Sequence, residues 1–326
     1  MHKINWGIIG CGDVTELKSG PAFNKVANSS LVAVMRRDGA KAADYARRHK
    51  VPAWYDDASR LIADPQVNAI YIATPPSSHA AYCYAAINAG KPVYVEKPMA
   101  LNSNEAFEMA AYAAAKNVKL TVAHYRRAQP MYKKIKQLLD DNTIGEVRLA
   151  KLDYYRRALT GTELQQPKTA WRVVAAISGG GLFHDLAPHQ LDMMFNFFGP
   201  VNKASGIATR QGITTRVHDL VAGNILFDSG VVFNGAWCFN APPGEEKDAC
   251  EIIGATGKIS FSFFETKPVT LTVNGQIQHL QFDTLPHVQQ PMIEKVVSYF
   301  LDEGLNPCNA VDGVEVMRLI DVFTKE

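Results

Sequence analysis

Apolar and polar residues follow one another along this chain with two different periods, and the change lies near Tyr125. Before it, short apolar runs alternate with longer segments that have apolar residues at helical spacing. The runs expected to form strands are residues 4–9, 31–35, 69–73, 92–95 and 119–123. The segments expected to form helices are residues 14–26, 40–49, 77–88 and 102–117. This alternation predicts an α/β fold built on a doubly wound parallel sheet.

After Tyr125 the sequence predicts a different architecture. One more helix is expected at residues 131–141, and apolar and polar residues then alternate one by one from Glu146 onward. Strands are expected at residues 221–227, 231–239, 259–263 and 269–273, with turns at residues 228–230 and at Asn274-Gly275. Further helices are expected at residues 186–198, 290–303 and 311–324. We therefore predict an α+β second domain with an open, mostly antiparallel sheet that has one wet face.

The two patterns divide the chain into domains at residues 1–125 and 126–326, and the C-terminal helix is expected to pack back on the first domain. The 326 residues, 47% of them hydrophobic, are enough for two cores. A net charge of +2 gives no field that would recruit nucleic acid or a membrane surface. The chain has 5 cysteines without a C-x-x-C pair and no signal-like start, which together favour a reducing cytoplasm.

The first predicted strand ends in a glycine turn, Gly10-Cys11-Gly12-Asp13-Val14, that opens the first helix. Gly10 permits a tight turn, and Gly12 lets backbone N–H groups approach a pyrophosphate without a Cβ in the way. The start of the helix adds partial positive charge. Thr15 replaces the third small residue of the dinucleotide fingerprint. The alternative is an ordinary glycine turn that closes any strand–helix unit.

The end of the second strand bears on the choice of cofactor. An acidic residue there would bind the ribose hydroxyls of NAD, but this strand ends in Met35-Arg36-Arg37-Asp38. Two guanidinium groups suit the 2′-phosphate of NADP, because arginine binds phosphate through a forked set of donors. NADP is therefore favoured over NAD. Asp38 as a displaced ribose ligand, and the arginines as solvated loop charges, are the alternatives.

Two groups of residues could handle protons. Lys97 follows a predicted parallel strand and precedes Pro98, which places it at the edge of the sheet where ligands bind. A desolvated lysine there can hold or pass a proton, and a surface lysine is the commoner alternative.

The second group follows three glycines, where Asp185, His189 and Asp192 share one helix face at spacings of four and three. A histidine beside a carboxylate can transfer protons near neutral pH. The alternatives are an N-cap role for Asp185, a solvated polar face, and a weakly supported metal site; we predict no metal.

Five motifs in order resemble the glucose–fructose oxidoreductase / inositol dehydrogenase / rhizopine-catabolism (Gfo/Idh/MocA) family across almost the whole chain. They are the glycine turn, Thr74-Pro75-Pro76 with His79, Glu96-Lys97-Pro98, Trp171-Arg172, and the glycine run with Asp185 and His189. The resemblance implies an N-terminal Rossmann domain that binds NAD(P). It also implies a C-terminal α+β domain that binds the substrate and forms a homodimer or homotetramer through its sheet.

The resemblance further implies hydride transfer between nicotinamide and a secondary alcohol or carbonyl of a sugar, polyol or related small hydroxy compound. It assigns proton handling to Lys97 and His189, and support of His189 or the substrate hydroxyl to Asp185. The residues that it places at the cofactor are Gly10, Cys11, Gly12, Asp13, Val14, Arg36, Arg37, Thr74, Pro75, Pro76, His79, Glu96, Lys97, His124, Trp171 and Arg172.

Some questions stay open at this stage. The family often has asparagine where His124 stands, and no role follows for His124, Asp192 or His287. Two other functions are conceivable on the same fold, because a fold does not fix a function. One is a sensor that binds NAD(P) and a sugar without turnover. The other is a glycoside hydrolase that recycles NAD.

Overall fold

A computed structural model describes residues 2–212 and 215–325 of the chain. The chain forms two compact units. Unit 1 comprises Met1–Gln129 and Leu285–Met317, and unit 2 comprises Pro130–Thr284 and Arg318–Glu326. No helix in the described part of the chain is both long enough and apolar enough to cross a membrane.

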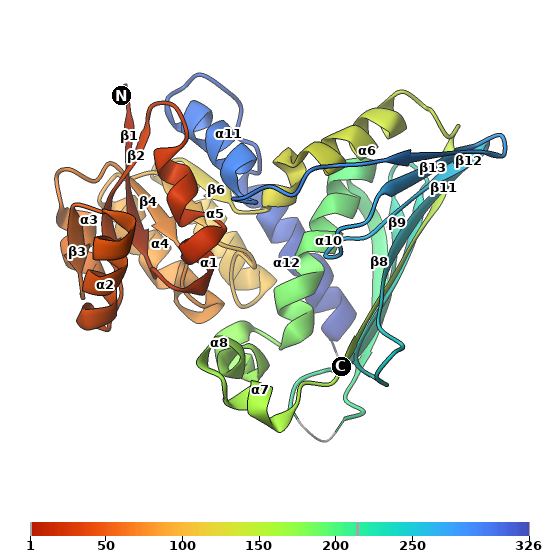
Figure 1. The fold of residues 1–326 in the computed structure, drawn as a ribbon, viewed down its shortest axis with the longest axis horizontal. Coiled ribbons are helices and arrows are strands. Elements are labelled where there is room, and N and C mark those ends of the chain that lie inside the picture. The colour runs from red at the N-terminus through yellow and green to blue at the C-terminus, as the bar shows by residue number, and fades with distance from the viewer. Residues whose placement is uncertain (1, 213–214, 326) are drawn as a thin grey trace. The chain divides into compact units, whose positions relative to one another are not determined.

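Unit 1 is built on a parallel six-stranded sheet in the order β3-β2-β1-β4-β5-β6 (Figure 1). The order reverses at β1, which is the pattern of a Rossmann sheet and places a ligand crevice at the carboxyl ends of β1 and β4. The strands are β1 (Ile4–Ile9), β2 (Ser29–Met35), β3 (Ala53–Tyr55), β4 (Ala69–Ile72), β5 (Val93–Val95) and β6 (Leu120–Val122). The predicted doubly wound sheet is confirmed, and β3 is an edge strand that the sequence pattern missed.

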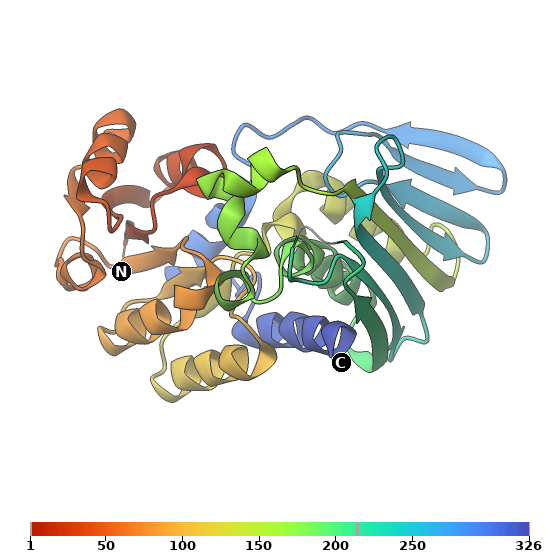
Figure 2. The same cartoon turned by 90° about the horizontal axis from the view of Figure 1, so that it is seen from below.

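The helices of unit 1 lie between these strands along the chain, except η3 and α11, which follow β6 (Figures 1 and 2). They are α1 (Asp13–Leu17), η1 (Gly20–Asn24), α2 (Gly39–His49), α3 (Ala58–Ala63), η2 (Pro76–Ser78), α4 (His79–Asn88), α5 (Ser103–Ala115), η3 (Tyr125–Ala128) and α11 (Gln290–Phe300). The single helix expected at residues 14–26 is wrong, because α1 ends at Leu17. Pro21 accounts for this end, since its ring would clash with the Leu17 carbonyl in a continuing helix.

Aromatic rings fill the core of unit 1. Trp6 packs against Phe23 and Phe300 with ring centroids 4.8 and 5.5 Å apart. Tyr71 stacks on Tyr94 at 5.2 Å, and both are fully buried. Phe300 belongs to α11, so the last third of the chain supplies part of the core on which β1 rests.

Unit 2 is built on an eight-stranded sheet in the order β14-β13-β12-β11-β7-β10-β9-β8. Among the strand pairs that the structure describes in this sheet, only β10–β7 is parallel. The strands are β7 (Val147–Arg157), β8 (Val201–Thr209), β9 (Leu220–Phe227), β10 (Val232–Ala241), β11 (Lys247–Gly254), β12 (Gly257–Phe261), β13 (Val269–Val273) and β14 (Gln276–Leu280). The predicted mostly antiparallel sheet is confirmed, and positive φ angles at Asn274 and Gly275 form the expected hairpin turn.

The helices of unit 2 are mostly short. They are α6 (Pro130–Asp140), α7 (Gly161–Gln165), α8 (Pro167–Ala170), η4 (Trp171–Val173), α9 (Ala175–Ser178) and α10 (Leu182–Phe198). The last helix of the chain, α12 (Ala310–Thr324), contributes residues to both units. The expected start of α10 at residue 186 is wrong, because Gly181 is the N-cap and Asp185 lies in the first turn.

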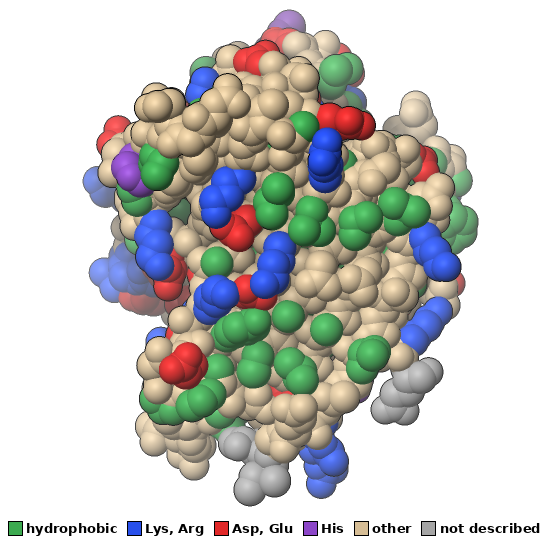
Figure 3. Space-filling view, turned by 90° about the vertical axis from the view of Figure 1, so that its right-hand side faces the viewer, with side chains coloured by type: hydrophobic (Ala, Val, Ile, Leu, Met, Phe, Trp, Pro, Cys, Tyr) green, Lys and Arg blue, Asp and Glu red, His purple; other side chains and the backbone are tan. Residues whose placement is uncertain are grey.

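One face of this sheet packs on helices and the other is exposed. Along β9 and β10 buried residues alternate with exposed ones, as predicted for a sheet with one wet face. On the buried face Gly206 and Gly223 leave room for Phe323 of α12, since a Cβ at Gly223 would lie 2.4 Å from that ring. On the outer face, seen in Figure 3, groups of hydrophobic side chains lie beside Lys, Arg, Asp and Glu side chains. Three of its exposed apolar residues are Ile207, Leu226 and Val232.

Candidate active site

The glycine turn after β1 has the geometry that a diphosphate requires. Gly10 has φ +95°, and its N–H donates to the Met35 carbonyl at 2.9 Å. At Gly12, by contrast, a Cβ would meet only the Gly10 carbonyl oxygen, at 3.9 Å. Thr15 is buried and donates to the Gly12 carbonyl at 2.8 Å, so it fastens the turn from within. The open space at Gly12 is where a backbone can approach a phosphate, and the residues fit a dinucleotide.

Three side chains follow β2 at the same edge of the sheet. Arg36 is half-buried and its Nη1 lies 3.4 Å from the carbonyl oxygen of Cys11 in the turn. Arg37 is exposed. Asp38 caps α2 by accepting from the Lys41 N–H at 3.2 Å, and it pairs with the Lys41 ammonium at 3.0 Å. The carboxylate of Asp38 is therefore engaged at the start of α2.

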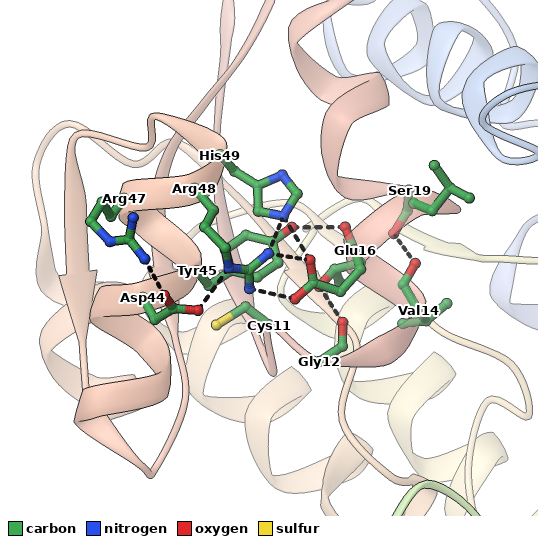
Figure 4. Close-up of polar contacts among 12 residues, drawn as sticks. Cys11, Gly12, Val14, Glu16, Ser19, Asp44, Tyr45, Arg47, Arg48 and His49 are labelled. Atoms are coloured by element: carbon green, nitrogen blue, oxygen red, sulfur yellow. Dashed lines mark hydrogen bonds and ion pairs between the residues drawn. The ribbon is translucent and has the colours of Figure 1, made fainter.

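Helices α1 and α2 are tied together beside the turn by an ion-pair network (Figure 4). Arg48 makes two bonds of 2.7 Å to the Glu16 carboxylate and one of 2.7 Å to Asp44. His49 lies 2.8 Å from the same Glu16 carboxylate. The bond from Arg48 is the main cause that lowers the pKa of Glu16 to about 2, so this carboxyl group is ionised at neutral pH.

The loops that follow β4 and β5 are joined by a buried histidine. His79 is fully buried, with Nε2 2.8 Å from the Thr74 carbonyl oxygen and Nδ1 3.0 Å from that of Pro98. Burial lowers the pKa of His79. Its ring therefore fixes the position of the Thr74–Pro76 loop relative to Pro98, and it has no exposed surface for direct contact with a ligand.

Lys97 is half-buried at the end of β5, and the peptide bond to Pro98 is cis. The residue before it, Glu96, is 5% exposed and accepts three hydrogen bonds. They come from the Tyr71 hydroxyl at 2.5 Å, the Gln289 amide at 2.6 Å and the Lys97 N–H at 3.1 Å. Burial raises the pKa of Tyr71 well above its ordinary value, so this hydroxyl keeps its proton and donates. The buried Glu96 carboxylate thus holds the backbone of the Lys97 loop through the Lys97 N–H.

Unit 1 therefore brings its candidates together at one edge. The residues Gly10–Gly12, Arg36–Arg37, Thr74–Pro76, Glu96–Lys97 and His124 follow β1, β2, β4, β5 and β6, which are neighbours in a parallel sheet. Parallel strands end at a common edge, so these residues share it. Cys11 and His124 are buried there, and burial raises the pKa of the Cys11 thiol to about 11.

In unit 2, Trp171, Arg172 and Asp185 form one cluster. The Arg172 guanidinium lies 4.8 Å from the centre of the Trp171 ring, and its Nε donates to Asp185 at 2.8 Å. Arg172, which the sequence predicts at the cofactor, is thus hydrogen-bonded to Asp185, which it predicts in catalysis. No pattern in the sequence predicted this pair, which joins η4 to α10.

His189 and Asp192 lie on the buried side of α10, at 5% and 1% exposure. This excludes a solvated polar face for these two residues. The His189 ring packs edge-on against Phe264, with centroids 5.8 Å apart. Asp248 fixes the loop that carries Phe264, because its carboxylate accepts from the N–H groups of residues 263, 264 and 265 at 3.0, 2.5 and 3.1 Å. Sequence reasoning missed both Asp248, which lies in β11, and Phe264, which follows β12, because neither belongs to a recognisable motif.

The glycines before α10 make room for the chain's own side chains. A Cβ at Gly180 would lie 2.1 Å from the ring of His184, and one at Gly181 would lie 2.5 Å from Val217. His184 is buried, and burial lowers its pKa to about 4, so the ring is neutral at pH 7. In the described residues no group of three His, Cys, Asp or Glu side chains could hold a metal ion.

Comparison with known families agrees with this geometry. Residues 4–124 match the family model described as oxidoreductase family, NAD-binding Rossmann fold, and residues 132–260 match the Gfo/Idh/MocA C-terminal domain. The chain belongs to the Gfo/Idh/MocA oxidoreductase family. It is therefore an oxidoreductase with an NAD-binding Rossmann fold, and the resemblance seen in its motifs is confirmed.

Named relatives span the chain. Oxidoreductase P35 of Formosa agariphila is 49% identical over 321 residues, which is 98% of each chain. Trans-1,2-dihydrobenzene-1,2-diol dehydrogenase of Xenopus laevis is 29% identical over 88% of this chain and 83% of its own. A levoglucosan dehydrogenase in complex with NADH superposes with a TM-score of 0.87 at 21% identity, over 98% of this chain and 96% of its own. This last likeness shows the fold.

Proposed function

We propose that this oxidoreductase transfers a hydride between NADP and a secondary alcohol or carbonyl carbon of a sugar, polyol or related cyclic hydroxy compound. The observation that carries the proposal is the shared edge of the unit 1 sheet. There the open Gly12 turn, Arg36 and Lys97 follow β1, β2 and β5 of the same parallel sheet. The nicotinamide supplies or accepts the hydride when bound, and the protein binds, orients and handles the proton.

The proposed roles of the side chains follow from their chemistry. Lys97 hydrogen-bonds the reacting oxygen and stabilises the negative charge that develops on it. His189 takes the hydroxyl proton in oxidation and returns it in reduction. Asp185 supports His189 or the substrate hydroxyl, and Arg172 holds Asp185 in place at 2.8 Å.

Turnover of single variants tests these roles. With an alcohol that the wild type oxidises, we expect Lys97→Ala and His189→Ala each to lower kcat by about 10²–10⁴-fold. The matched controls are Lys91→Ala and His279→Ala, which lie in the same two units away from the proposed machinery. Unchanged kcat in both active-site variants would remove the mechanism.

The preference for NADP rests on Arg36 and Asp38. Arg36 stands where an NAD-specific chain has an acidic residue. The Asp38 carboxylate, in contrast, already binds the N–H and the ammonium of Lys41 at the start of α2. NADP is therefore expected to raise the melting temperature more than NAD at equal concentration. Arg36→Ala and Arg37→Ala together are expected to remove that difference. Equal stabilisation of the wild type by both cofactors would contradict the preference.

The substrate class is supported by the relatives and by the packing around His189. Relatives are named as dehydrogenases of levoglucosan and of trans-1,2-dihydrobenzene-1,2-diol, both cyclic compounds with secondary hydroxyl groups. The Phe264 ring beside His189 offers an apolar surface of the kind that packs on the C–H face of a ring. Screening cyclic and open-chain polyols by absorbance of reduced nicotinamide tests the class. Open-chain alcohols as the better substrates would contradict it.

Two further features belong to the proposal. The outer face of the unit 2 sheet is the proposed contact for a homodimer or homotetramer, because it exposes Leu226 and Val232 side by side on paired strands. We also propose that the protein works in the cytoplasm, since the thiols of Cys11, Cys83 and Cys250 are buried without disulfides.

A further inference from the structure

The break after α1 leaves carbonyl groups that another part of unit 1 must satisfy. Pro21 prevents the helix from continuing, so the Leu17 and Lys18 carbonyls lack the usual donors of a following turn. Residues 287–289 supply them. His287 Nδ1 lies 2.7 Å from the Leu17 oxygen, and the Gln289 N–H donates to the Lys18 oxygen at 3.1 Å. Because a carbonyl only accepts, His287 carries its proton on Nδ1.

The Gln289 side chain reaches the lysine loop from the same segment. It is fully buried, donates to Glu96 at 2.6 Å and accepts from the Tyr94 hydroxyl at 3.3 Å. Glu96 in turn accepts from the Lys97 N–H at 3.1 Å. One short segment is therefore bonded both to the helix that follows the glycine turn and to the carboxylate beneath Lys97.

A buried amide in this position cannot be lost without consequence. If Gln289 became apolar, Glu96 would lose a donor and the Tyr94 hydroxyl would lose its acceptor, both away from water. The Glu96 carboxylate would then move toward its remaining donors, and the Lys97 backbone is one of them. A shift of this kind acts on the geometry of Lys97 without touching the lysine side chain.

We propose that residues 287–289 form a brace with two arms, and that Gln289 and His287 are positioning residues. Gln289 fixes Lys97 through Glu96, and His287 fixes α1, and with it the glycine turn, through the Leu17 carbonyl. The proposal rests on the proposed function, in which Lys97 handles charge at the reacting oxygen and the turn binds the cofactor.

The Gln289 arm is tested by Gln289→Leu, with Gln290→Leu as the matched control. Gln290 is the next residue, and its side-chain amide donates to the Glu294 carboxylate at 3.2 Å in an exposed pair. We expect Gln289→Leu to lower kcat by about 10- to 100-fold and to shift the pH profile of kcat, with little change in substrate KM. Gln290→Leu is expected to leave both unchanged.

Gln289→Glu gives a signature that loss of stability alone would not give. Its carboxyl would share the site with Glu96, and two carboxyls this close bind one proton between them. We therefore expect activity near the wild-type level at acid pH, because the shared proton restores the hydrogen bond between residue 289 and Glu96. Activity should fall as the pH rises and this proton is lost. This variant also keeps the test decisive if Gln289→Leu does not fold.

The His287 arm should affect the cofactor instead. His287→Leu removes the donor to Leu17 and is expected to weaken NADPH binding by about tenfold, measured by nicotinamide fluorescence. His287→Gln offers an N–H in its place and is expected to restore most of the affinity. Gln289→Leu is expected to change this affinity much less than it changes kcat.

Outcomes separate the brace from the proposed function. If the wild type binds no NAD(P)H and oxidises no alcohol, the proposed function fails. If the wild type is active but Gln289→Leu and Gln289→Glu keep its kcat and pH profile, the Gln289 arm is wrong. If His287→Leu binds NADPH as the wild type does, the His287 arm is wrong. A fall in melting temperature without these changes also contradicts the brace, because it indicates packing alone.

Discussion

Arg172 donates from Nε to Oδ2 of Asp185 at 2.8 Å and so joins η4 to the first turn of α10. The two side chains are 29% and 14% exposed. A partly buried pair of this kind is stabilising only while both partners are present, since either charge alone remains poorly solvated. The pair therefore couples η4, which carries Trp171, to the helix that carries His189.

This coupling is measurable as non-additive stability. We expect Arg172→Leu and Asp185→Asn each to lower the free energy of unfolding, and the double variant to lose about 1–2 kcal/mol less than the sum. Denaturant unfolding of the four proteins gives the coupling. The control is the Arg157–Glu163 pair, which is 42% and 31% exposed, and for which the coupling should be much smaller because solvent screens it. Strict additivity at Arg172 and Asp185 would contradict the prediction.

The two glycines of the turn should respond differently to the same substitution. Gly10→Ala is expected to destabilise the fold by about 1–3 kcal/mol, because φ is +95° and the new Cβ would lie 2.7 Å from Thr74. Gly12→Ala should leave the melting temperature nearly unchanged and weaken NADPH binding by about tenfold or more, since its Cβ would enter the open space beside the turn. Thermal unfolding and fluorescence titration measure the two effects. Full affinity in Gly12→Ala would exclude a diphosphate at this turn.

The Glu16–Arg48 pair predicts a pH dependence of stability. Arg48 is the main cause that lowers the pKa of Glu16 from 4.5 to about 2 in the folded chain. The stabilisation of the folded chain by the ionised Glu16 is therefore complete above about pH 4.5, and it is lost as the pH falls toward 2.

Glu16→Gln tests this pH window. The variant should be less stable than the wild type at neutral pH, and the difference should shrink in this acidic range. Denaturant unfolding at several pH values measures it, with Glu108→Gln, at an exposed position of α5, as the control. A difference that stays constant down to about pH 3 would mean that the pair does not set the pKa.

The outer face of the unit 2 sheet gives a prediction about assembly. Leu226 and Val232 are 38% and 40% exposed and stand opposite one another on β9 and β10. If this face holds an oligomer together, Leu226→Lys should produce monomers, because a charge would be buried in an apolar contact. Light scattering after size exclusion measures the mass. Leu305→Lys, at an exposed apolar position of unit 1, should not change it.

Periodicity alone was enough for most of the elements, because burial imposes a period on each of them. The strand Ile4–Ile9 has the predicted bounds, and the helix expected at residues 40–49 is α2 (Gly39–His49). The hydrophobic pattern failed to predict an element where a proline ended a helix or where a helix was very short. Pro21 divided the first predicted helix, and the short helices α7 to α9 have too few residues to show a period. The candidate residues at strand ends were predictable, since parallel strands end at one edge.

The amino-acid sequence by itself determined the fold class and the family, through strand and helix periods and motifs that each lie within a few neighbouring residues. Only the tertiary structure decided how distant side chains complete those motifs. Gln289 lies 193 residues after Glu96 and bonds to it at 2.6 Å, and Arg172 of η4 pairs with Asp185 of α10. No local pattern encodes such contacts, because each depends on where a separate element is packed by its own apolar residues. The sequence thus named Lys97 as a candidate, and the fold showed what holds its loop.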